Sequence, residues 1–169
     1  MVLCPIYWIS IVWLHCNSIE NSNEIYLSVF KENTILKQSS KTRLVFPLKS
    51  DDGGLPLISA QLADQNSRPC LFDTGSQPIF INNIYVSKLP KLRSAHVIGF
   101  GNDGIRSIPI VIVPKLTIGH CVLKNVPAMS ADISHLNPTE PYMCILGCAL
   151  FHDAAVTLNF QTKQLILQT

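Results

Sequence analysis

Asp73, Thr74, Gly75 and Ser76 are the consecutive residues whose types are best suited to chemistry. The apolar runs 70–72 and 79–81 flank them, so the sequence predicts a carboxylate at a tight turn between two buried strands. Thr and Ser hydroxyls can fix such a turn by bonding to the backbone, and glycine allows a close approach to the acid or to a ligand. The arrangement suits acid–base catalysis by a rigidly held carboxylate, and an ordinary Asx turn is the simpler alternative.

A single carboxylate is a weak acid–base catalyst, whereas two Asp side chains that share one proton can act as acid and base together. The sequence has one Asp-Thr-Gly-Ser tetrapeptide and no second copy. Asp103, Asp132 and Asp153 lack a strand–turn setting of this kind. Two copies of Asp73, related by the two-fold axis of a homodimer, would provide the pair.

Short strands joined by turns are expected along most of the chain beyond residue 43. Leu44, Phe46 and Leu48 alternate with other residues, which is a strand pattern. Asn82 and Asn83 are expected to cap a short helix over residues 84–89. The remaining predicted strands are 57–62, 70–72, 79–81, 95–100, 105–113, 116–118, 122–126, 144–147, 156–160 and 165–167, with a helical turn over 148–152. The sequence therefore predicts a single all-β domain with one or two short helices.

The composition fits this class and excludes others. Charged residues make up 14% of the chain, and 11 Pro and 8 Gly residues provide many turns. A net charge of +2 without a Lys/Arg cluster gives no basis for nucleic-acid binding. Cys144, Cys148 and His152 are spaced by four, but Gly147 interrupts the helix that would align them and no fourth ligand is evident. We therefore expect no metal and no cofactor.

The first residues differ from the rest. Residues 1–18 contain no Asp, Glu, Lys or Arg and are predicted to be a signal peptide or a membrane anchor. Residues 19–43 are expected to be a polar linker, and residues 44–169 form the predicted domain. The expected location is exported, periplasmic or secreted, or tethered to a membrane. The alternatives for this apolar segment are a buried strand of the domain, or translation from a start codon upstream of the real one.

Four cysteines lie beyond this leader, at positions 70, 121, 144 and 148. An even number in an exported domain permits disulfides, but the sequence does not define the pairing. Free buried thiols are equally compatible with the sequence.

Residues 71–76, the run Ile145-Leu146-Gly147 before a helical turn, and the closing segments 156–160 and 164–167 together resemble the retropepsin-like aspartic proteases, the single-domain homodimeric relatives of pepsin. The resemblance covers roughly residues 44–167. It implies a closed β-barrel in which Ile145, Leu146 and Gly147 form a supporting strand beneath the active-site loop. It also implies an endopeptidase that uses an activated water, without a covalent intermediate.

The resemblance assigns roles within the loop. Asp73 of each protomer would form the catalytic dyad, and Thr74 would brace the loop across the two-fold axis. Gly75 would offer backbone contacts to an extended peptide or protein substrate. Ser76 would bond the outer carboxylate oxygen and hold it in place.

A flap is the remaining element that the family implies. This hairpin should lie near residues 97–107, where Gly99, Gly101 and Gly104 would supply mobility.

Three alternatives to a protease stay open at this point. They are an inactive peptide-binding or dimerisation module of the same fold, a secreted structural β-domain, and a thiol-redox protein that uses Cys144 and Cys148.

Overall fold

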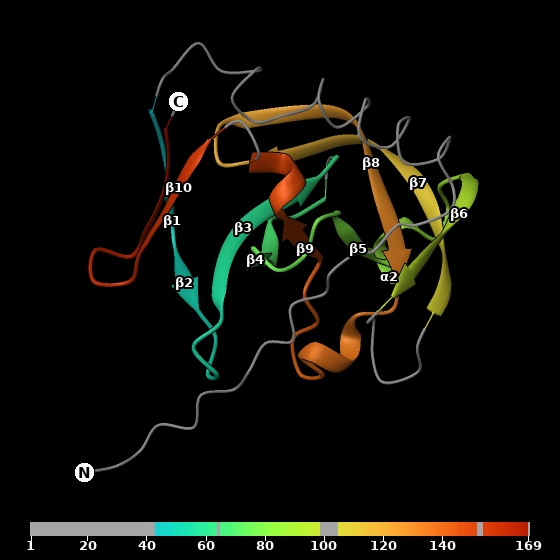
Figure 1. Cartoon of the computed structure of the whole chain (residues 1–169), viewed down its shortest axis with the longest axis horizontal. Coiled ribbons are helices and arrows are strands. Elements are labelled where there is room, and N and C mark those ends of the chain that lie inside the picture. Colours follow the sequence, from blue (N-terminus) through green and yellow to red (C-terminus); the bar gives the residue numbers. More distant parts are fainter. Residues whose placement is uncertain (1–42, 64, 99–104, 152–153, 169) are drawn as a thin grey trace.

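The computed structural model describes residues 43–63, 65–98, 105–151 and 154–168 (Figure 1). The predicted leader, residues 1–18, and the predicted linker except Arg43 lie outside these ranges. So do Gly99, Gly101 and Gly104, the glycines assigned to the tip of the flap.

Sheet A is a three-stranded antiparallel sheet with the order β1-β11-β10, at the left of Figure 1. Its strands are β1 (Arg43–Pro47), β10 (Ala155–Asn159) and β11 (Gln164–Gln168). Leu44 and Phe46 are buried and alternate with more exposed neighbours, because successive side chains of a strand point to opposite faces. The predicted strand at Leu44 and the predicted closing hairpin are both confirmed.

Sheet B has eight strands in the order β2-β3-β4-β9-β5-β8-β7-β6. Their bounds are β2 (Lys49–Ser50), β3 (Pro56–Leu62), β4 (Arg68–Asp73), β5 (Phe80–Asn82), β6 (Lys91–Ile98), β7 (Ile105–Ile118), β8 (Cys121–Ala131) and β9 (Cys144–Gly147). Strand β3 also pairs with β7, so successive pairings lead from β3 through β4, β9, β5, β8 and β7 back to β3. The pairs β4–β9 and β5–β8 are parallel, and the others are antiparallel.

Helical structure in the described part of the chain is confined to short segments. They are α2 (Asn83–Val86) and the 3-10 helices η1 (Ser134–Leu136) and η2 (Cys148–Phe151). Asn82 caps α2 as predicted, since its side-chain oxygen accepts a hydrogen bond from the Ile84 N–H at 3.3 Å. The prediction that the helix reaches Leu89 is wrong, because α2 ends at Val86. The Leu89 N–H still donates to the Val86 carbonyl oxygen at 2.9 Å, so a single turn follows the helix.

The central strands β4 and β9 are covered on both faces. Phe72 of β4 and Leu146 of β9 belong to the larger hydrophobic cluster, whereas their neighbours Leu71 and Ile145 belong to a second cluster. The Phe72 ring also packs against Phe151 of η2, with ring centroids 5.1 Å apart. Burial of each such side chain stabilises the fold by about 1.5–3 kcal/mol, so this parallel pair is firmly held.

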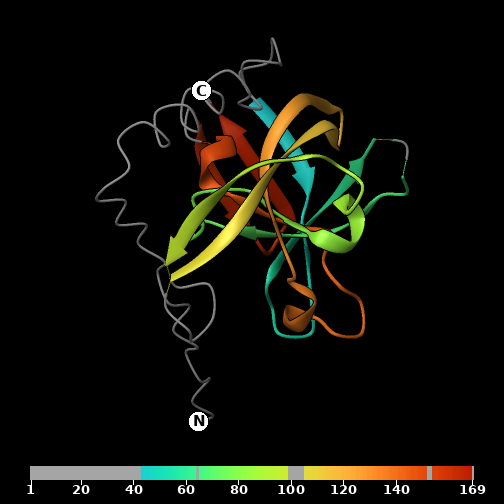
Figure 2. The ribbon, with the colours of Figure 1, turned by 90° about the vertical axis from the view of Figure 1, so that its right-hand side faces the viewer.

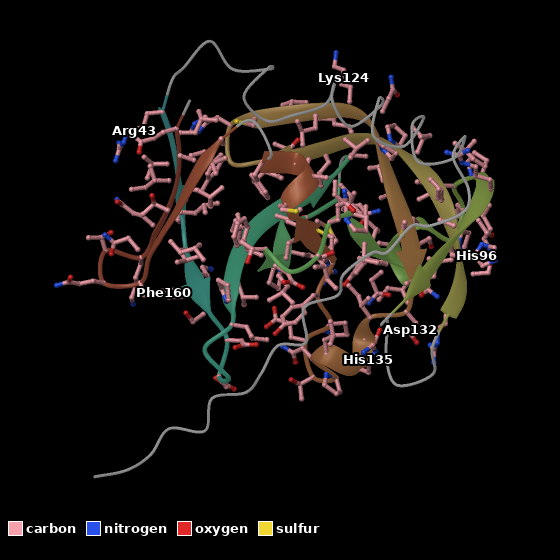
Figure 3. The ribbon with its side chains drawn as sticks, in the orientation of Figure 1. Arg43, His96, Lys124, Asp132, His135 and Phe160 are labelled. Carbon is pink, nitrogen blue, oxygen red and sulfur yellow. The ribbon has the colours of Figure 1, made fainter. Side chains whose placement is uncertain are left out.

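The β6–β7 hairpin extends away from this centre. Figure 2 shows the yellow-green β6 and the yellow first part of β7 projecting from the rest of sheet B. In Figure 3, His96 on β6 and Phe160 beside sheet A mark opposite ends of the molecule.

The described strands and short helices confirm the all-β prediction. Among the described residues, no helix is long and apolar enough to cross a membrane.

Candidate active site

Asp73 ends β4 and begins the loop that leads to β5. Its carboxylate oxygen Oδ1 accepts a hydrogen bond from the Gly75 N–H at 2.8 Å, and its carbonyl oxygen accepts one from the Ser76 N–H at 3.2 Å. A Cβ atom on Gly75 would lie only 3.1 Å from Asp73 Oδ1, so glycine permits the close approach of loop and acid. The Asp73 side chain is half-buried. The loop therefore fixes a carboxylate that solvent or a ligand can still reach.

Strand β9 supports the loop from one side. It runs parallel to β4 with Asp73 opposite Gly147. Beyond the strand end, the Cys148 N–H donates to the Ser76 carbonyl oxygen at 2.8 Å, and the Ala149 N–H donates to the Gln77 carbonyl oxygen at 3.0 Å. The start of η2 is thereby bonded directly to the loop that follows Asp73.

Gly147 lies where no side chain fits. A Cβ atom at this position would be 2.1 Å from the carbonyl oxygen of Pro78 and 2.7 Å from that of Gln77. The structure thus brings Ile145, Leu146 and Gly147 beside residues 71–73, where a supporting strand was expected.

Ser76 does not act as the resemblance implied. Its hydroxyl donates to the Pro78 carbonyl oxygen at 3.0 Å, and the side chain is buried. Since a hydroxyl has one proton to donate, the predicted bond to the Asp73 carboxylate is wrong. The Gly75 N–H takes that place, and Ser76 instead stabilises the turn before β5. No sequence signal distinguishes the two acceptors, because both are close to Ser76 along the chain.

Thr74 and Cys148 are the exposed residues beside the acid. Although Cys148 is exposed, partial desolvation by the surrounding protein raises the pKa of its thiol, and the negative charge of Asp73 raises it further. The thiol is therefore within electrostatic reach of the carboxylate. The raised pKa keeps Cys148 protonated at neutral pH and therefore a weak nucleophile. Cys144 is fully buried on β9 with its sulfur next to Cys70, not Cys148. This arrangement disfavours a redox pair made of Cys144 and Cys148.

The hairpin expected to cover the site is present up to its tip. Val97 pairs with Arg106 and Ile98 with Ile105, so β6 and β7 run antiparallel to the last described residues. The structure therefore has a long hairpin at the predicted position of the flap, and its glycine-rich tip lies outside the described residues.

A cavity of about 600 Å³ lies between this hairpin, helix α2 and the end of β8. Its wall carries both positive and negative charge, and Asp73 is not part of it. Asp132, at the end of β8 in Figure 3, contributes the negative charge, and the Ser134 N–H that donates to it at 2.9 Å lowers its pKa. The lining residues are Asn83, Ile84, Val86, Ser87, Lys91, Arg106, Ser107, Ile108, Pro109, Ser130, Ala131 and Asp132.

Within the described part of the chain, no group of three or more His, Cys, Asp or Glu side chains is placed to hold a metal ion.

Comparison with known proteins gives likenesses of structure only. No family model matches the sequence, and no curated protein matches it. A retropepsin-like aspartic protease from Rickettsia conorii has a similar structure, with 16% sequence identity, a TM-score of 0.49, and coverage of 74% of this chain and 89% of that chain.

Two further solved structures are similar. One is a protein of unknown function from Legionella pneumophila, with 16% identity, a TM-score of 0.37, and coverage of 57% of this chain and 84% of that chain. The other is Basic 7S globulin from soybean, with 13% identity, a TM-score of 0.40, and coverage of 75% of this chain and 41% of that chain. Since these TM-scores lie below 0.5, we infer function from the residues of the site.

Proposed function

We propose that this chain is an aspartic endopeptidase of the retropepsin type, with sheet B as its barrel and Asp73 as its catalytic residue. The observation that carries the proposal is the fixed, half-buried carboxylate at the end of β4. A carboxylate in an ordinary turn needs no support from a distant strand. Here residues 147–149 contact the loop through two backbone hydrogen bonds and a glycine that leaves no space for a side chain.

The second acid would come from a second copy of the chain. No described residue places another carboxylate in hydrogen-bond contact with Asp73. In a two-fold dimer the two Asp73 side chains would meet and share one proton, because like charges in contact resist joint ionisation. Thr74 is exposed in the protomer and is free to reach the partner loop. Exposed Val156 of β10 and Phe160 offer apolar surface for a contact between copies.

The reaction would be direct hydrolysis. The ionised Asp73 takes a proton from a water molecule, which attacks the peptide carbonyl carbon, while the protonated Asp73 of the other copy donates to the carbonyl oxygen. The resulting tetrahedral intermediate then breaks its C–N bond. The amine leaves with the proton that the first Asp73 took from water, and a hydroxyl of the intermediate returns a proton to the other Asp73. An extended substrate would lie between the loop and the β6–β7 hairpin, recognised largely through its backbone.

Substitution of Asp73 tests the assignment. Asp73→Asn keeps the shape of the side chain and its acceptor oxygen for the Gly75 N–H, so the fold should be retained while cleavage of a peptide library falls at least about a thousandfold. Asp52→Asn is the matched control, because Asp52 is an exposed acid in the turn between β2 and β3 and should leave cleavage unchanged. Equal turnover of wild type and Asp73→Asn would eliminate the proposal.

Mixing of subunits tests the shared site. Wild type and Asp73→Asn subunits, mixed in equal amounts and allowed to exchange, should leave about one quarter of the dimers with two intact acids, and activity per total protein should fall to that share. Activity that stays at one half would mean that each chain works alone and would refute the dyad. If the wild type dimerises but cleaves nothing in the library, the chain is the inactive binding module instead.

A further inference from the structure

Two cysteines face each other inside the sheet, three positions before Asp73 and three before Gly147. Cys70 of β4 and Cys144 of β9 are paired in the parallel register, and neither side chain is exposed to solvent. Both are free thiols in this structure, and their Sγ atoms are 2.7 Å apart. Neither cysteine has a part in the hydrolysis proposed for Asp73.

The register of β4 and β9 is compatible with the geometry of a disulfide. Neighbouring strands lie about 4.7–4.9 Å apart, within the range of about 4.4–6.8 Å that Cα atoms of a disulfide span. Atoms that are not bonded normally settle about 3.5–4.0 Å apart, so the two sulfurs are closer than a simple contact requires. Only a small side-chain adjustment separates this pair from a covalent bond.

We propose that Cys70 and Cys144 form an intramolecular disulfide that joins β4 to β9. The oxidant would be a small-molecule or protein disulfide, such as oxidised glutathione. One cysteine, as the thiolate, attacks an oxidant sulfur, breaks its S–S bond and releases one thiolate. The second cysteine then attacks the mixed disulfide, forms the bond between Cys70 and Cys144, and releases the other thiolate. Two electrons and two protons thus pass from the cysteines to the oxidant, which leaves as two thiols.

Burial determines when the bond can form. Burial raises the pKa of the Cys144 thiol well above its ordinary value, and the neighbouring Cys70 raises it further, so thiolate is scarce in the folded protein. The exchange therefore takes place while the chain is folding, before sheet B closes over the pair. Once formed, the bond is as inaccessible to reductants as the thiols are to oxidants.

The other described cysteines are poor competitors. Cys121 is buried at the start of β8, and Cys148 is exposed at the start of η2. Neither stands opposite Cys70 in the register of the sheet, where Cys144 is the partner. The structure thus selects one pairing among those that the sequence leaves open.

Peptide mapping of the full chain tests the bond directly. The protein is unfolded and reduced, and then refolded in a mixture of oxidised and reduced glutathione. It is next blocked with N-ethylmaleimide under denaturing conditions, so that buried thiols react too, and is digested and analysed by mass spectrometry. We expect the peptides of Cys70 and Cys144 to be linked, with a mass lower than their sum by two hydrogens. Recovery of both cysteines as maleimide adducts, or of either bonded to another cysteine, would overturn the proposal.

Thermal unfolding gives a second measurement, in which protein refolded in the glutathione mixture is compared with protein refolded in the presence of a phosphine reductant. A bond across a loop of this size should raise the midpoint of the refolded protein by about 5–15 °C. Cys148→Ser should keep the full shift, and the double variant Cys70→Ala/Cys144→Ala should lose it. An equal shift in the double variant would refute the assignment. Should that variant fail to fold, peptide mapping of the unaltered chain decides alone. Neither measurement depends on peptide cleavage, so this proposal and the proposed protease activity can fail separately.

Discussion

Gly147→Ala is the substitution for which the structure predicts a large effect from one added carbon. The new Cβ atom would lie 2.1 Å from the Pro78 carbonyl oxygen and 2.8 Å from its carbonyl carbon. Both are backbone atoms, so no side chain can turn away to make room. To restore an ordinary contact of 3.4 Å, the loop or β9 must move by roughly 1.3 Å within a closely packed interior.

The cost follows from what this movement breaks. Overpacking of a core position typically costs about 1–3 kcal/mol, and here the shift also strains two hydrogen bonds worth about 0.5–1.5 kcal/mol each. These are the bonds from Cys148 and Ala149 to the loop. We therefore expect Gly147→Ala to lower the free energy of unfolding by about 2–6 kcal/mol, a large share of the total of about 5–15 kcal/mol for a domain.

Equilibrium unfolding in urea measures this loss without any assay of activity. Gly53→Ala is the matched control, because the nearest atom to its new Cβ would be the Asp51 side-chain oxygen at 3.4 Å, in an exposed turn. The control should stay within about 0.5 kcal/mol of the wild type. If both variants unfold at the same urea concentration with the same slope, the close packing of Gly147 against the loop is not real.

Two further substitutions test polar contacts that hold the surroundings of the site. Burial, together with a hydrogen bond to Asp51, raises the pKa of Tyr142 to about 12, above the unfolded value of about 10. A pKa that is higher in the folded state contributes about 2–3 kcal/mol to the free energy of unfolding. This contribution is complete below about pH 10 and is lost as the pH rises to about 12. Tyr142→Phe should therefore flatten the alkaline loss of stability measured by urea unfolding, and an unchanged slope would contradict the assignment. Asn82→Ala removes both the cap of α2 and a 3.0 Å hydrogen bond to η1, so the free energy of unfolding should fall by about 2 kcal/mol. Asn83 is its exposed neighbour, and Asn83→Ala should change the free energy of unfolding by under about 0.5 kcal/mol. Equal effects of the two asparagine variants would show that the buried amide contributes little.

Local patterns were sufficient to predict most of the strands and the position of Asp73. The alternation from Leu44, the turn residues between β3 and β4, and the apolar run before Gly147 each reflect a constraint acting within a few residues. Two separate strands were predicted over residues 105–113 and 116–118, with a break that includes Pro114. The strand in fact continues from Ile105 to Ile118. Opposite Pro114, Asn125 adopts a φ of 52°, and the ladder resumes at Lys115, so the missing donor falls at an irregular position.

What could not be predicted depends on which distant residues meet. The partner of Cys70 is 74 positions away and follows only from the parallel register of β4 and β9. The contact between Tyr142 and Asp51 likewise joins a loop to a turn 91 positions earlier. For Ser76 two acceptors were close in sequence, and the path of the loop decided between them. Register and loop path are properties of the assembled sheet, so no window of sequence contains them.

The pairing of β1 with β11 has a consequence for biosynthesis. Arg43, at the start of the described chain, bonds in register with Gln168 at its end, and the loop of Asp73 is supported by residues that follow position 143. A ribosome therefore makes Asp73 long before it makes the strand that supports its loop. Contacts of such high order form late and slowly, so the emerging chain passes through synthesis without an organised carboxylate.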